Sequence, residues 1–128
     1  MTLAVESKWV VESGERLEGW MIFLVEIDHV KSGPLLTPET GREFIEQIIF
    51  PTIALAEQLV AEKKILAGGP VLGRVALRFI VQADSLQDVD RMVTSLPIWP
   101  LAETRITPLI ALGDRRDHAK GILERLKT

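Results

Sequence analysis

Histidines, arginines and carboxylates are the side chains of this 128-residue chain that could do chemistry. His29 follows an alternating apolar run and is the candidate general base. An imidazole can take a proton from an activated carbon near neutral pH and return it one position along. The alternative is a strand-end histidine that is hydrogen-bonded to a loop carbonyl or solvated. His118, the other histidine, lies in a polar C-terminal segment that is typical of a surface position.

The charged candidates before and after His29 are sorted by strand parity. Asp28 could orient His29 or ionise freely, but neighbours on a strand point to opposite faces, so direct pairing needs a bend. Glu26, Arg78 and Arg105 fall on one parity, each in its own predicted strand. They form either a charge-paired network at a subunit interface, since buried charges need partners, or a site where an arginine fork binds a substrate carboxylate.

The segment LPIWPLAETRITPL, residues 96–109, places Trp99 between two prolines. Pro97 ends a predicted helix, and Pro100 biases the tryptophan toward an extended backbone. Trp99 is therefore expected at a helix-to-strand corner, where it could cap a cleft or contact another subunit.

Composition narrows the class of protein. Apolar residues make up 47% of the chain and the mean hydropathy is +0.20, which indicates apolar surface that another subunit covers. The 15 basic and 18 acidic residues are interspersed and give a net charge of −3, so a nucleic-acid partner is not expected.

Other classes of site and location are also disfavoured. Cysteine is absent, which excludes disulfides and thiolate sites, and neither HxH nor HExxH spacing occurs, so no metal site is expected. No apolar run approaches the roughly 18–20 residues of a membrane helix. The start of the chain carries an early glutamate rather than a signal-peptide core, and a cytoplasmic protein is the default expectation.

Periodicity predicts the elements. We expect strands at 20–30, 65–73, 74–84 and 103–112, a helix from Thr37 to near Lys64 that is kinked at Pro51, and a helix capped by Ser85. The predicted inward residues of the two helices are Phe44, Ile45, Ile48, Ile49, Leu55, Ala56, Leu59 and Val60, then Leu86, Val89, Met92, Val93 and Leu96. Residues 1–19 are an arm or extra strand, 20–112 the domain, and 113–128 a C-terminal helix.

The order β-α-β-β-α-β predicts a ferredoxin-like α+β fold, with a four-stranded antiparallel sheet and both helices on one face. The other face would expose Ile22, Leu24 and Ile80 in a monomer. We therefore expect self-association through the sheet face, with two sheets packed face to face in a dimer or a larger ring.

Several motifs resemble the muconolactone isomerase family over roughly residues 20–110. They are MIFLVEID at 21–28, GRVA at 73–76, and LPIWP at 96–100 leading to TRITPL at 104–109. The resemblance implies a dimeric α+β barrel, a ring-like homo-oligomer, and a cofactor-free 1,3-proton shift in an unsaturated lactone during aromatic catabolism. Arg74 matches the basic position of the family's Gly-Arg, which implies that it binds a substrate carboxylate. It could equally be solvated at a hairpin end.

Two features keep other functions open. The chain has ILAGGP where that family carries a strand rich in tryptophan and arginine, and Val75 and Leu77 at tyrosine and asparagine positions. A non-catalytic ligand-binding or assembly member of the superfamily is therefore the alternative. KKILAGGPV and FIVQADSLQDVDRMV also resemble YCII-like relatives, although residues 34–44 lack the histidine that those proteins pair with an aspartate. A cofactor-free monooxygenase or a haem-binding relative is a third possibility, and haem would need an axial ligand.

Overall fold

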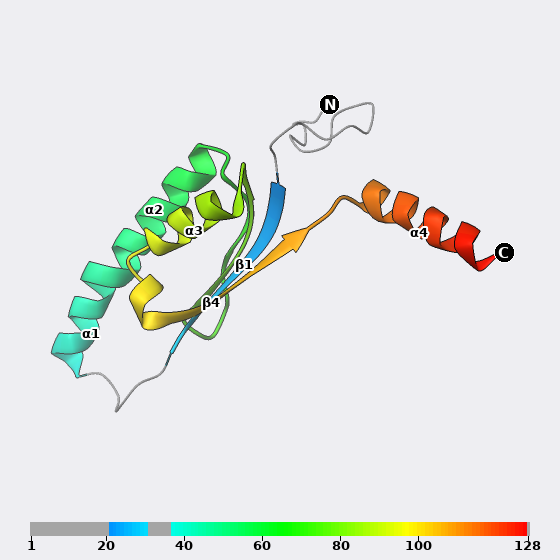
Figure 1. Cartoon of the computed structure of the whole chain (residues 1–128). Helices are drawn as coiled ribbons and strands as arrows, with labels where there is room; N and C mark the ends of the chain where they lie inside the picture. Colours follow the sequence, from blue (N-terminus) through cyan, green and yellow to red (C-terminus); the bar gives the residue numbers. More distant parts are fainter. Residues whose placement is uncertain (1–20, 31–36, 128) are drawn as a thin grey trace.

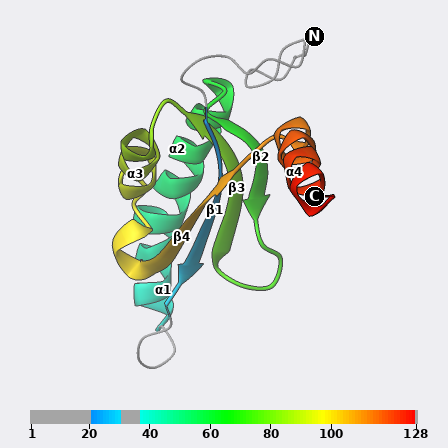
Figure 2. The same ribbon diagram turned by 45° about the vertical axis from the view of Figure 1, so that its right-hand side comes forward.

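The fold comes from a computed structural model that describes residues 21–30 and 37–127. Its elements are β1 (Met21–His29), α1 (Pro38–Phe44), η1 (Ile45–Ile49), α2 (Phe50–Ala61), β2 (Ile65–Pro70), β3 (Ala76–Ala83), α3 (Leu86–Thr94), η2 (Trp99–Leu101), β4 (Ala102–Leu109) and α4 (Leu112–Leu126). Figures 1 and 2 show helices α1 to α3 on one face of the sheet and α4 on the other side. The predicted arm at 1–19 lies outside the described residues.

The sheet has the predicted antiparallel topology, with strand order β2-β3-β1-β4. Alternation along β1 turns Phe23, Val25 and Ile27 toward the helices, where each is almost fully buried. Glu26 lies opposite Arg78 of β3 on one side. On its other side Glu26 lies opposite Arg105 of β4. The three charged residues that were predicted to share one face of the sheet therefore lie together on its open face, the face that α1 to α3 do not cover.

The long first helix begins at the predicted cap. The Thr37 hydroxyl accepts a hydrogen bond from the Thr40 N–H at 3.2 Å, and the Thr40 hydroxyl lies 2.9 Å from the Thr37 N–H in a capping box. The helix runs through Pro51 as predicted, but a π-helical turn at Ile45–Ile49 precedes the proline. Proline has no N–H to donate and crowds the carbonyl four residues earlier, and a wider turn accommodates both effects.

Length and composition alone would allow Pro38–Ala61, which has 24 residues, to cross a membrane. This corrects the sequence expectation, which considered only uninterrupted apolar runs. In the structure one side of the helix covers the sheet, with Leu59 buried and Phe44 and Leu55 packed against the core.

Three predicted inward residues are exposed. Ile45 and Val60 of the first helix face outward because their neighbours Phe44 and Leu59 point toward the sheet, and consecutive residues of a helix point about 100° apart. Leu86 occupies the first turn of α3. The other predicted helix residues belong to the core or pack against it. These exposed side chains add to the apolar surface that the composition indicated.

Candidate functional site

His29 lies at the end of β1, on the helix side of the sheet. Its ring is 5.2 Å from the ring of Phe44, centroid to centroid, with the two planes tilted by 54°. The backbone N–H of His29 donates to the Val75 carbonyl at 3.0 Å, which fixes the strand end against the loop before β3. The side chain is half-buried and touches an aromatic wall, as a base that acts on an apolar substrate would require.

The proline segment forms the neighbouring corner. Ala102 pairs with His29 in the sheet, so the short helix η2 that carries Trp99 leads directly into the strand beside the histidine. The Ile98 N–H donates to the buried Thr52 hydroxyl at 3.2 Å, which ties this corner to α2. Trp99 is exposed at the predicted helix-to-strand corner. The expectation of an extended backbone before Pro100 is wrong, because Trp99 begins the 3₁₀ helix η2, in which the Leu101 N–H donates to the Ile98 carbonyl.

An ion cluster occupies the open face at the same end of the sheet. Arg78 Nη2 lies 3.1 Å from Asp28 Oδ1, and Arg78 Nε lies 3.5 Å from Glu26 Oε2. Arg74 Nη2 also reaches Asp28 Oδ1, at 3.2 Å. Asp28 thus binds two arginines and points away from His29, so the idea that it orients the histidine is wrong.

The three arginines differ in how many partners each has within the chain. Arg78 is 29% exposed and also donates from Nη1 to the Leu77 carbonyl at 2.9 Å, so its donors are largely used within the chain. Arg74 has one carboxylate partner and is 58% exposed. Arg105 lies opposite Glu26, but within residues 21–30 and 37–127 no carboxylate is within ion-pair range of it. The structure brings Glu26, Asp28, Arg74 and Arg78 together and leaves Arg105 apart.

Comparison with solved structures places this arrangement in a known fold. A crystal structure of muconolactone isomerase superposes with a TM-score of 0.58 and 20% sequence identity, over 71% of this chain and 90% of that chain. The chain has the fold of muconolactone isomerase, a ferredoxin-like α+β arrangement with a four-stranded antiparallel sheet. No family model and no curated protein matches the sequence.

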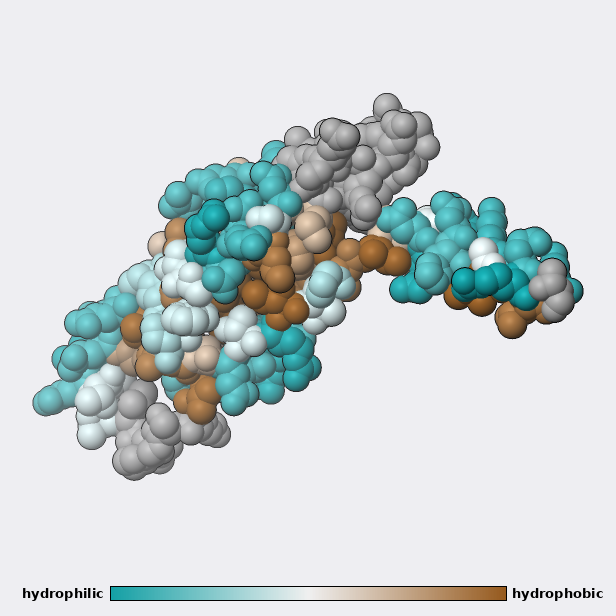
Figure 3. Space-filling view, viewed as in Figure 1, coloured by the Kyte–Doolittle hydropathy of each residue, from teal (hydrophilic) through white to brown (hydrophobic). Residues whose placement is uncertain are grey.

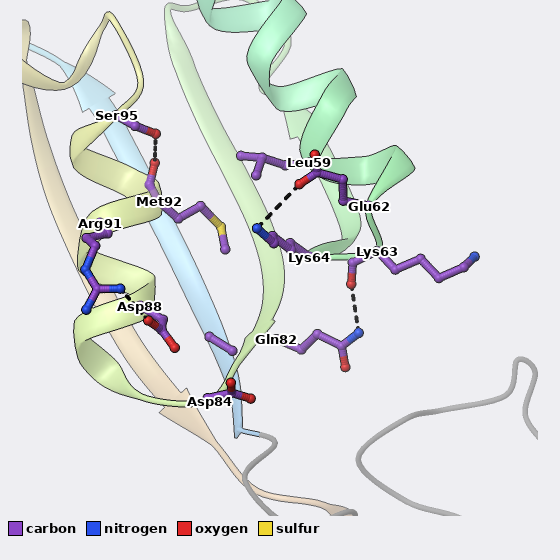
Figure 4. Close-up of a pocket in the computed structure, with 11 residues that line it drawn as sticks. Leu59, Glu62, Lys63, Lys64, Gln82, Asp84, Asp88, Arg91, Met92 and Ser95 are labelled. Carbon is purple, nitrogen blue, oxygen red and sulfur yellow. Dashed lines mark hydrogen bonds and ion pairs between the residues drawn. The ribbon is translucent and has the colours of Figure 1, made fainter.

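On this muconolactone isomerase fold, a cavity of about 610 Å³ opens between the C-terminal end of α2 and α3, at the opposite end of the sheet from His29 (Figure 4). Leu59 and Met92 supply its apolar side. Its walls are completed by Glu62, Lys63, Lys64, Gln82, Ala83, Asp84, Asp88, Arg91 and Ser95. Sequence reasoning missed this cavity, because its residues come from three segments that carry no motif.

Charges around this cavity are mostly paired. Lys64 Nζ lies 3.4 Å from Glu62 Oε1, and Arg91 Nη1 lies 2.7 Å from Asp88 Oδ1. The Gln58 amide, which donates to Glu62 at 3.0 Å, and then Lys64 lower the pKa of Glu62. The cavity therefore has a charge-balanced rim, and no single ion is attracted strongly.

A second cavity of about 210 Å³ lies between α2 and the edge strand β2. Leu77 and Phe79 form its inner wall. Neither of the two cavities has His29 or Trp99 in its wall. Among the described residues, no group of three or more His, Asp or Glu side chains could hold a metal ion.

Proposed function

We propose that this chain is a cofactor-independent isomerase that moves a proton between two carbons of a small, unsaturated, carboxylated lactone. The observation that carries the proposal is the position of His29, half-buried against Phe44 beside the Trp99 corner. The likeness to muconolactone isomerase supports the same class of reaction.

The reaction needs one group that both accepts and donates a proton. The neutral His29 imidazole takes a proton from the γ-carbon of the α,β-unsaturated lactone, and the electron pair moves into a conjugated dienolate. The imidazolium then returns the proton to the carbon next to the lactone carbonyl, two carbons away, and the double bond shifts. No electrons or atoms are gained or lost overall, so the step needs no redox partner.

Arg74 is the best candidate for holding the substrate carboxylate. It lies next to Val75, whose carbonyl accepts a hydrogen bond from the backbone N–H of His29, so Arg74 is at the same end of the sheet as the histidine. It is more exposed than Arg78 and has fewer partners within the chain, which leaves donors for a bidentate contact. Trp99 would cover the apolar part of the substrate from the η2 corner.

A homodimer through the open sheet face completes the proposal. Leu24 and Ile80 lie side by side on that face, and Arg105 lacks an ion-pair partner among the described residues. In a two-fold pairing of sheets the same patch serves both copies, so an unpaired arginine can meet a carboxylate of the second copy. Packing two such faces would remove the apolar strip from water.

Turnover of muconolactone, followed by ultraviolet absorbance, tests the activity directly. The wild-type chain should convert the substrate, and His29→Ala should lower kcat by about 100-fold or more, the range for losing a general base. His118→Ala, on exposed α4, is the matched control and should leave the rate unchanged. An inactive wild type rejects this substrate, and a fully active His29→Ala rejects this base.

A ligand-binding or assembly role without catalysis is the second candidate. Two observations favour this role. Leu77 and Phe79 are buried in the core between the sheet and the helices, and both cavities lie away from His29. An isolated dimer that binds a small molecule near Met92 without turnover would support this role over the first.

A further inference from the structure

The cavity of about 610 Å³ between the C-terminal end of α2 and α3, called here the α2–α3 cavity, has the size and the surfaces of a ligand site. Leu59, which is buried, and Met92, which packs against the core, form its apolar side. Cavities of about 300 to 1,000 Å³ hold small organic molecules in other proteins. The apolar side of this one would hold the hydrocarbon part of such a molecule.

Both signs of charge surround this cavity in equal number. Figure 3 shows hydrophilic residues gathered on the surface where α2 ends and α3 begins. Among the described residues, the cavity wall holds three acidic and three basic side chains, which are Glu62, Asp84, Asp88, Lys63, Lys64 and Arg91. A ligand with a single charge would meet like charges in this wall, and these lower its affinity. A ligand with one positive and one negative group can place each against a side chain of opposite sign.

The turn after α2 holds Lys64 at the cavity. Lys63 has a φ of +64°, which is uncommon for a residue with a side chain. The turn is fixed by the Lys64 N–H, which donates to the Leu59 carbonyl at 2.9 Å, and by the buried Gln82, which donates from Nε2 to the Lys63 carbonyl at 2.7 Å. Figure 4 shows the Lys64 side chain extending from this turn toward Met92. Its ammonium group therefore faces the apolar side of the cavity.

Lys64 and Asp88 come from opposite sides of the cavity, one after the end of α2 and the other in the first turn of α3 (Figure 4). Each has one exposed ion-pair partner, Glu62 at 3.4 Å from Lys64 and Arg91 at 2.7 Å from Asp88. Exposed ion pairs contribute little to stability. Either group can therefore bind a ligand, beside its present partner or in place of it, at little cost to the fold.

We propose that the α2–α3 cavity binds a free amino acid with a large apolar side chain. The Lys64 ammonium donates to the carboxylate of the amino acid, the Asp88 carboxylate accepts from its ammonium group, and its side chain lies on Leu59 and Met92. The cavity is at the opposite end of the sheet from His29. The inference therefore goes beyond the proposed isomerase activity and does not depend on it.

Three compounds that differ in one charged group test the requirement for both charges. L-phenylalanine has both groups, 3-phenylpropanoate lacks the ammonium, and 2-phenylethylamine lacks the carboxylate. Isothermal titration calorimetry of the full-length chain should show saturable binding of L-phenylalanine. Either analogue should bind about tenfold or more weakly, because it has lost a hydrogen bond between charged groups. No binding of L-phenylalanine at millimolar concentration overturns the proposal, and so does equal affinity for all three compounds.

Substitutions assign the two polar contacts. Lys64→Met removes the ammonium at similar side-chain length, so it should weaken L-phenylalanine binding about tenfold or more and leave the weak binding of 2-phenylethylamine unchanged. Asp88→Asn should weaken L-phenylalanine binding in the same way and leave that of 3-phenylpropanoate unchanged. Asp90→Asn, at an exposed position two residues further along α3, is the matched control and should bind like wild type. Wild-type affinity in both Lys64→Met and Asp88→Asn overturns the assigned contacts.

NMR of methionine-methyl-labelled protein locates the ligand. The Met92 methyl signal, assigned with Met92→Leu, should shift when L-phenylalanine is added, because the aromatic ring would lie on it. The ring signals of His29 should not move, and His29→Ala should bind L-phenylalanine like wild type. A shift at His29 without one at Met92 would place the ligand at the histidine and overturn the cavity site. A chain that binds L-phenylalanine in this way but does not convert muconolactone keeps this inference and loses the proposed activity.

Discussion

Asp28 and His29 are neighbours in the sequence but lie on opposite faces of the sheet. Asp28 binds Arg74 and Arg78 on the open face, whereas His29 packs its ring against Phe44 on the helix face. The carboxylate and the imidazole therefore serve two different surfaces. If His29 moves a proton, Asp28 is not the group that orients it, and the ion pairs of Arg78 with Glu26 and Asp28 have a structural or interface role of their own.

Removing Arg78 should destabilise the fold measurably. Arg78→Ala leaves Glu26 and Asp28 without their shared, partly buried donor, and hydrogen bonds to charged groups contribute about 1.5–3 kcal/mol. Urea unfolding should report a loss in this range. The matched control is Arg91→Ala, which breaks a pair whose arginine is 75% exposed and should cost about 0.5 kcal/mol or less. Equal losses in the two variants would contradict the role given to the cluster.

Much of the fold follows from sequence pattern. Alternation in β1 predicted which residues face the helices, and the Thr37 and Ser85 caps predicted where two helices begin. These features are local, since a strand's parity and a cap's hydrogen bond depend on residues a few positions apart. The β-α-β-β-α-β order then limited the sheet to the observed topology.

Contacts between distant segments were less predictable. Strand register places Glu26 opposite both Arg78 and Arg105, yet of these two only Arg78 forms an ion pair with it. The direction of each arginine side chain, which register does not determine, decides which guanidinium lies within ion-pair distance of the carboxylate. The link from Thr52 to Ile98 joins residues 46 positions apart and has no sequence signature. The exposed Val60 also escaped prediction, because it lies at the edge of the apolar stripe beside the buried Leu59, and the sequence does not show how much of that stripe the sheet covers.

The hydrogen bond between Thr52 and Ile98 should hold the Trp99 corner in place. Thr52→Val removes the buried hydroxyl and leaves the Ile98 N–H without its acceptor, at a cost of about 1–3 kcal/mol. Amide hydrogen exchange measured by NMR should show the Ile98 amide losing protection. Thr52→Ser keeps the hydroxyl and should keep that protection. An Ile98 amide that stays protected in Thr52→Val would show that another group fixes the corner.

Gly68 should tolerate no side chain. Its φ is +110°, and an added Cβ would lie 2.0 Å from the Arg78 carbonyl oxygen. Gly68→Ala combines backbone strain with a clash against a neighbouring strand, for a loss of about 2–5 kcal/mol. Gly69→Ala, one residue on, meets nothing within 4 Å and should change stability by about 0.5 kcal/mol or less. The urea unfolding midpoints of the two variants test this difference. Similar midpoints would show that the backbone at Gly68 does not lie so close to the Arg78 carbonyl.

The open sheet face should control self-association. Leu24 is half-buried beside Ile80 in one copy, so Leu24→Asp places a charge where two apolar strips are proposed to meet. An unpaired charge at the centre of such a contact costs about 2 kcal/mol or more, which raises the dimer Kd by about 30-fold. Light scattering after size exclusion, over a concentration series, measures that shift.

The control for this face must carry the same chemical change elsewhere. Leu72→Asp alters a residue that is 97% exposed in the loop between β2 and β3, away from the paired strips, and should leave the dimer Kd at the wild-type value. Circular dichroism of both variants checks that each is folded. A Leu24→Asp chain that stays folded and dimerises like wild type would move the interface off the sheet face, because no sheet-on-sheet packing buries an aspartate at that position without loss.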